Sequence, residues 1–77
     1  MGNYMDKIEI NPNIMFGKPV IKGTRITVEA ILEEFGDGKD MQDLLKSYPH
    51  LDTDAVWAAF RFAADALRGE RTYPIAI

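Results

Sequence analysis

The order of polar and apolar residues near the start of the chain predicts a short β-hairpin. Residues 7–10 alternate polar and apolar side chains with the period of two of a half-buried strand, and Asn and Pro residues then end the run. Residues 19–22 form a second β-branched run between two glycines, and Pro19 suits an edge strand. We therefore expect a hairpin within residues 7–22. Since two strands alone are barely stable in water, they should lie on helices or pair with another chain.

Further along, apolar residues recur at the i, i+3, i+4, i+7 spacing of amphipathic helices. The first helix should begin after Thr27, which caps it, and end before Gly36, which would adopt the left-handed conformation. The second should begin at Asp40, with Asp43 completing a capping box, and end at Pro49. The apolar positions of the two helices are Val28, Ile31, Leu32, Phe35, Met41, Leu44, Leu45 and Tyr48.

A third helix should begin after Asp52 and end just before Gly69, and residues 55–67 make it apolar on most of its circumference. Two short neighbouring helices cannot cover all of that surface. We therefore expect a homodimer in which a second copy covers the remaining face. The alternative is a compact monomer in which the N-terminal hairpin folds over that face. The residues predicted for the dimer interface are Trp57, Phe60, Phe62 and Ala66.

These elements predict a mainly α fold, a three-helix homeodomain-like (helix-turn-helix) bundle with a short N-terminal β-hairpin. A chain of 77 residues has room for one domain, which we place at residues 7–68. Residues 1–6 are expected to be a flexible N-terminus. The tail, residues 69–77, has a short charged linker at 69–72 and an apolar end at 73–77, which would be either disordered or docked on a partner.

Composition excludes several classes of protein. The chain has no cysteine, so neither disulfides nor thiolate metal sites stabilise it, and with one histidine it cannot form a multi-histidine metal site. No apolar run is long enough for a membrane span, and the N-terminus lacks a hydrophobic signal core, so we expect a cytoplasmic protein. Nucleotide-binding glycine motifs and nucleophile–histidine pairs are also missing. We therefore expect no cofactor, no catalytic residue and no enzyme activity.

The net charge of −3 conceals a gradient along the chain. Residues 1–25 hold four cations and two carboxylates, whereas residues 26–54 hold two cations and eight carboxylates. The basic segment is a candidate phosphate-binding surface, and the acidic helices would suit a basic protein partner unless they are only solvated. In the structural alternative, Thr24 bonds locally and Arg25 pairs with a carboxylate such as Glu29. The residues predicted to contact nucleic acid are Lys18, Lys22, Thr24, Arg25 and Arg61.

Arg61 is included because it is the strongest base-reading side chain on the exposed side of the third helix. The other residues expected there are Asp52, Thr53, Asp54, Trp57 and Ala58. Two aspartates near phosphates are unfavourable, so binding through this helix alone is doubtful. The basic N-terminal segments of a dimer are better suited to the phosphate contacts.

Residues 17–28 read GKPVIKGTRITV and are followed by two helices, a Tyr-Pro-x-Leu turn and an alanine-rich helix. This order, over residues 10–67, resembles the small prokaryotic family called domain of unknown function 433. The resemblance implies a homeodomain-like fold similar to small antitoxins, which dimerise, bind operator DNA and mask a ribonuclease-like toxin. We therefore expect a non-catalytic, antitoxin-like binding module. The alternatives are a DNA-binding transcriptional regulator without a toxin and a structural dimerisation or adaptor domain.

Overall fold

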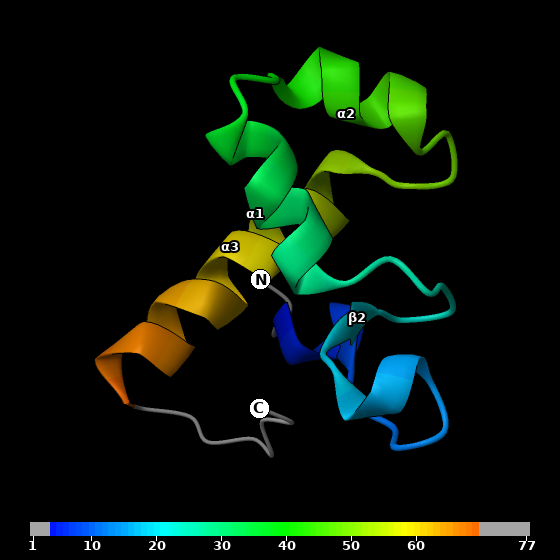
Figure 1. Cartoon of the computed structure of the whole chain (residues 1–77), viewed down its shortest axis with the longest axis vertical. Helices are drawn as coiled ribbons and strands as arrows, with labels where there is room; N and C mark the ends of the chain where they lie inside the picture. Colours follow the sequence, from blue (N-terminus) through cyan, green and yellow to red (C-terminus); the bar gives the residue numbers. More distant parts are fainter. Residues whose placement is uncertain (1–3, 70–77) are drawn as a thin grey trace.

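The computed structural model describes residues 4–69. It is mainly helical, with a small two-stranded antiparallel sheet before three α-helices, and so confirms the predicted fold class (Figure 1). The strands are β1 (Ile8–Glu9) and β2 (Val20–Ile21), and the α-helices are α1 (Val28–Gly36), α2 (Met41–Ser47) and α3 (Thr53–Arg68). Two short 3-10 segments complete the fold, η1 (Tyr4–Lys7) before β1 and η2 (Met15–Gly17) between the strands.

The hairpin forms within one chain and is shorter than predicted. Ile8 lies opposite Ile21 and Glu9 lies opposite Val20. Lys7 belongs to η1 instead of β1, although its carbonyl still accepts the Lys22 N–H at 2.8 Å. Beyond the hairpin, the Pro19 carbonyl accepts a hydrogen bond from the first residue of α1 at 2.9 Å, so the hairpin is joined directly to the helices.

All three helices begin at the residues that their capping side chains predict. Thr27, Asp40 and Asp52 each accept a hydrogen bond from the backbone N–H three residues later, at 2.8–2.9 Å. Asp43 returns a bond to the Asp40 N–H at 3.1 Å and completes the predicted capping box. At its other end α3 stops at Gly69, whose φ of +80° is left-handed, as expected.

The predicted end of α1 is wrong by one residue, and the predicted left-handed glycine is wrong by two. Gly36 is the last residue of the helix, and the left-handed glycine is Gly38, with φ of +95°. The helix continues because the Asp37 N–H still bonds to carbonyls of its last turn, including that of Glu33 at 2.9 Å. Gly38 then bonds to the Phe35 carbonyl at 3.0 Å and reverses the chain toward α2.

Helix α3 is the centre of the fold, because it packs against α1, η1 and β1. The N-terminal segment therefore covers part of the apolar surface of α3, which is the kind of cover expected for the monomer alternative. Met5 packs on the core, so residues 4–6, placed in the segment expected to be flexible, form part of η1 and belong to the packed domain. The largest fully buried side chains are Phe62, Ile31, Leu44, Val20 and Val56.

Candidate nucleic-acid interface

The candidate interface is built on the turn between β2 and α1, residues 22–25, which we call the basic turn. Gly23 adopts φ of +81°, a conformation that a residue with a side chain rarely takes. The Thr24 hydroxyl donates to the Ile21 carbonyl at 2.8 Å and accepts the Ile26 N–H at 3.0 Å. These bonds hold the turn in one shape. They also show that Thr24, predicted as a phosphate contact, makes the local bonds of the structural alternative.

The two cations of the basic turn, Lys22 and Arg25, are exposed. Within residues 4–69 neither forms an ion pair with a carboxylate. Glu29, the partner suggested for Arg25, instead pairs with Lys18 at 3.1 Å. The structural alternative, in which Arg25 pairs with a carboxylate such as Glu29, is therefore not what the described residues form: Arg25 keeps its donors available to a ligand, and Lys18 shares its charge with Glu29.

A shallow depression of about 290 Å³ lies beside the basic turn. It brings Lys22 together with Lys7 and with His50 of the connection between α2 and α3. Two carboxylates, Asp6 and Asp52, are also among its lining residues. The prediction of phosphate contacts omitted Lys7 and His50, since they come from separate parts of the chain. The register of the hairpin places Lys7 next to Lys22, so a correct strand pairing could have indicated Lys7. Nothing in the sequence could have indicated His50.

The lysines and the histidine at the depression can donate hydrogen bonds from this surface. Among the described residues, no group of three or more His, Asp or Glu side chains is arranged to hold a metal ion. Lysine and arginine are among the side chains that contact phosphate oxygens, and a rigid turn keeps the entropy cost of such contacts low. The same described part of the chain has no helix that is long and apolar enough to cross a membrane.

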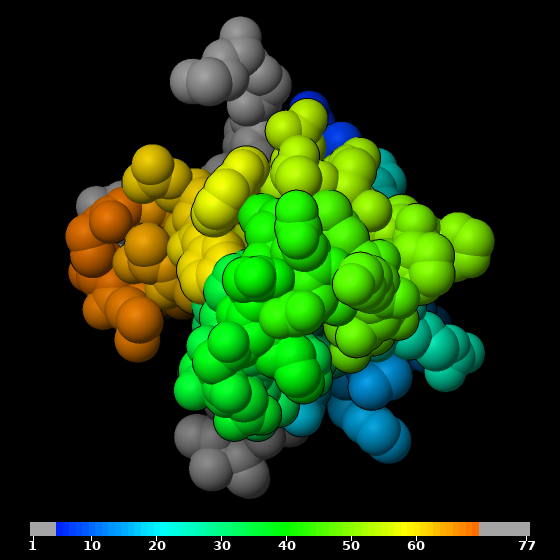
Figure 2. Space-filling view, turned by 90° about the horizontal axis from the view of Figure 1, so that it is seen from above, coloured from blue at the N-terminus to red at the C-terminus, as the bar shows by residue number. Residues whose placement is uncertain are grey.

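Arg61 does not join the basic turn. It lies on α3, whose second half extends to the side of the molecule opposite the hairpin and the basic turn (Figures 1 and 2). Another expected member of its face, Ala58, is only 3% exposed and belongs to the core. Ala58 is buried because its side of α3 faces the rest of the domain. The exposed surface of α3 around Arg61 is therefore narrower than predicted, and it carries the carboxylate of Asp54 at its start.

The four residues predicted for a dimer interface fall into different environments. Phe62 is 1% exposed and belongs to the hydrophobic core of its own chain, so the prediction for it is wrong, because a second copy cannot contact it there. Trp57 is 58% exposed, with its ring 6.1 Å from that of Phe60. Phe60 is partly buried against Phe35, edge to face at 5.0 Å, and Ala66 is also partly buried.

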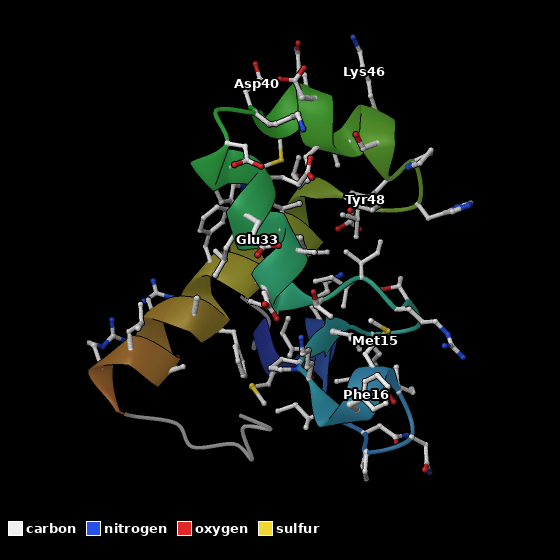
Figure 3. All side chains as sticks on the ribbon, viewed as in Figure 1. Met15, Phe16, Glu33, Asp40, Lys46 and Tyr48 are labelled. Carbon is white, nitrogen blue, oxygen red and sulfur yellow. The ribbon has the colours of Figure 1, made fainter. Side chains whose placement is uncertain are left out.

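Most acidic residues of α1 and α2 have local partners. Asp40 and Asp43 form the capping box, and Glu34 pairs with Lys39 at 3.1 Å. The hydrogen bond and charge of Glu34 raise the pKa of Lys39 above 10.5. Glu33 projects from the exposed side of α1 (Figure 3), and with Asp37 it remains available to a partner.

Known proteins resemble this chain in both sequence and structure. A protein from Sinorhizobium fredii (strain NBRC 101917 / NGR234), described as "Uncharacterized protein y4eO", is 34% identical over 62 residues, which are 79% of this chain and 28% of that protein. The crystal structure of a DUF433 member protein from Anabaena variabilis ATCC 29413 has 27% sequence identity and a TM-score of 0.77, covering 82% of this chain and 62% of that one. This chain thus spans under a third of the first relative's length and under two thirds of the second's.

The family whose description reads "Protein of unknown function (DUF433)" matches residues 8–63. The matched residues begin at β1, include the basic turn, α1 and α2, and end within α3. They therefore contain both the hairpin and the helical core. The chain belongs to the DUF433 family of proteins of unknown function.

Proposed function

We propose that this chain is a non-catalytic, antitoxin-like binding module whose basic turn contacts the phosphates of operator DNA. The observation that carries the proposal is that Lys22 and Arg25 are exposed on a hydrogen-bonded turn and pair with no carboxylate of residues 4–69. Two exposed, unpaired cations on a turn whose backbone is fixed by hydrogen bonds are suited to an anionic partner.

The charge around the turn supports the same partner. Residues 10–25 contain three cations and no carboxylate. At the depression, Asp6 and Asp52 balance Lys7 and Lys22, so the positive charge is concentrated in residues 10–25. This concentration of positive charge in a chain of net charge −3 favours a local phosphate contact over general attraction to nucleic acid.

The test is the salt dependence of binding to labelled DNA from upstream of the gene. The variant Lys22→Ala/Arg25→Ala should bind more weakly, and the slope of log affinity against log salt should become shallower by about 2, one for each lost phosphate contact. The matched control is Lys46→Ala, which removes an exposed lysine from the far end of α2 (Figure 3) and should change neither quantity. An unchanged slope in the double variant would contradict the proposal.

A second candidate function is binding of a basic protein such as a ribonuclease-like toxin. The observation that favours it is the pair of carboxylates on and just after α1, Glu33 and Asp37, which are exposed and form no ion pair within residues 4–69. If an adjacent gene encodes a small nuclease-like protein, Glu33→Lys/Asp37→Lys should slow its association with this chain, mainly at low salt. Equal association rates for the variant and the wild-type chain would remove this candidate.

The proposed module acts as a homodimer through the exposed side of α3. Trp57 at 58% and Leu67 at 89% exposure support this, because large apolar side chains at such positions gain from a second copy. Sedimentation at micromolar concentration should give a dimer for the wild-type chain and a monomer for Trp57→Ala. A wild-type monomer would contradict the dimer and leave the phosphate contact to a single basic turn.

A further inference from the structure

The loop between the strands of the hairpin presents an aromatic side chain that the fold does not use. Phe16, in η2, is 86% exposed. Figure 3 places it, with Met15, at the end of the molecule away from α2. Because the ring contributes so little buried area, burial in the core does not explain why a large apolar side chain lies here.

The backbone at this position is strained. Met15, Phe16 and Gly17 follow one another with φ of +50°, +61° and +84°. The left-handed conformation is natural for Gly17 but unfavourable for the two residues that carry side chains. Such outliers concentrate at functional positions, where the surrounding structure maintains them.

Hydrogen bonds around Phe16 maintain the strained shape. The Ile14 N–H donates to the Asn11 carbonyl at 2.8 Å, and the Gly17 N–H donates to the Ile14 carbonyl at 3.1 Å. The Lys18 N–H then donates to the Met15 carbonyl at 3.1 Å. The loop is closed by bonds on both sides of Phe16, so the ring stands on a rigid support and loses little conformational entropy when it binds.

From this geometry we propose that Phe16 stacks on a base of the nucleic acid whose phosphates the basic turn contacts. The inference rests on the proposed function and adds an apolar contact to it. The loop and the basic turn are joined by β2 and lie on the same side of the molecule (Figures 1 and 2). An exposed aromatic ring beside cations is the combination with which proteins hold unstacked bases, whereas a basic protein partner would be repelled here.

The nearest cation to Phe16 in sequence also fits this partner. Lys18 pairs with Glu29, but both side chains are about half exposed, at 47% and 57%. An exposed ion pair of this kind is weak, so the ammonium can exchange the carboxylate for a phosphate. Phe16 would then provide stacking while Lys18, Lys22 and Arg25 face the backbone of the same nucleic acid.

The experiment compares wild-type protein with Phe16→Gly, using a short labelled oligonucleotide as a single strand and as a duplex at several salt concentrations. Glycine tolerates the left-handed φ, so this variant loses the ring without disturbing the loop, which a thermal melt verifies. Its affinity should fall about tenfold, with the salt slope unchanged because no phosphate contact is lost. A larger loss on the single strand assigns the contact to an unpaired base, and a larger loss on the duplex assigns it to insertion between base pairs.

Two controls separate the failure of this inference from failure of the proposed function. Ile10→Ala removes another exposed apolar side chain, one outside both the basic turn and the proposed dimer surface, and should leave affinity unchanged. Phe16→Trp retains a stacking ring and should bind as the wild-type chain does. If Phe16→Gly binds normally while Lys22→Ala/Arg25→Ala shows a shallower salt slope, the inference is overturned and the proposed function stands. If the wild-type chain binds neither oligonucleotide nor its upstream DNA, both are overturned. Loss of dimerisation in Phe16→Gly with unchanged affinity would assign the ring to a second copy and also overturn the inference.

Discussion

The acidic residues of the helical part and the basic residues around the hairpin differ in what their side chains contact. Asp40, Asp43 and Asp52 bond to backbone N–H groups at the starts of α2 and α3. Lys22 and Arg25 form no ion pair with a described residue. Carboxylates that satisfy helix termini are needed for stability, whereas cations without such contacts are available for binding. The abundance of acidic residues in this chain therefore says more about its helices than about its ligand.

The largest expected effect on stability is loss of the helix caps. Asp40→Ala and Asp52→Ala should each lower the free energy of unfolding by about 1 kcal/mol, because each leaves backbone N–H groups of a helix start without their acceptor. Urea denaturation followed by circular dichroism measures the change. Lys22→Ala/Arg25→Ala should stay within about 0.5 kcal/mol of the wild-type value, since it removes no contact within the described structure. Equal losses in the two sets of variants would abolish the distinction between structural carboxylates and available cations.

Replacement of Phe16 should raise stability. Phe16→Gly removes the unfavourable left-handed conformation of a residue with a side chain, but glycine also increases the freedom of the unfolded chain. The net gain should be up to about 1 kcal/mol in the free energy of unfolding, measured by the same urea titration. A loss of stability instead would mean that the ring packs on the loop in solution and is not a free binding element.

The Lys18–Glu29 pair should contribute less. Both side chains are about half exposed, so a double-mutant cycle with Lys18→Ala and Glu29→Ala should give a coupling below about 0.5 kcal/mol that decreases with added salt. Thermal melts of the four proteins at low and high salt supply the cycle. A coupling that persists at high salt would place Lys18 with the structural charges and not with the binding cations.

The smallest effect concerns Lys39, a cation that does have a partner. Its raised pKa means that the folded chain binds the proton more tightly than the unfolded chain does, so the pair with Glu34 stabilises the fold at neutral pH. This stabilisation is lost as the pH rises from about 10.5 through the pKa of the folded state. Glu34→Gln should return the pKa of Lys39 toward 10.5 in an NMR titration of its side chain. An unchanged pKa would show that the exposed pair does not persist in solution.

Local sequence was sufficient to predict the helices, because each start depends on a capping side chain and a backbone N–H only three residues away. It failed for Gly36, where the choice between two glycines depends on which carbonyls the last turn of α1 can still reach. For the candidate site, it identified Lys22 and Arg25 but did not identify Lys18 as the partner of Glu29. That choice depends on how the loop before β2 returns Lys18 to the side of α1.

The apolar surface of α3 shows most clearly which properties follow from the sequence alone and which depend on the tertiary structure. The sequence by itself determined that this helix needs cover on more than one face, since apolar residues occupy most of its circumference. Only the tertiary structure decided that η1 and β1 provide much of that cover, leaving Trp57 and Leu67 exposed. Likewise, composition determined where positive charge is concentrated, but chain packing decided which cations lack a carboxylate. Helical periodicity and capping act within one or two turns, whereas cover and charge pairing depend on distances between segments far apart in the chain.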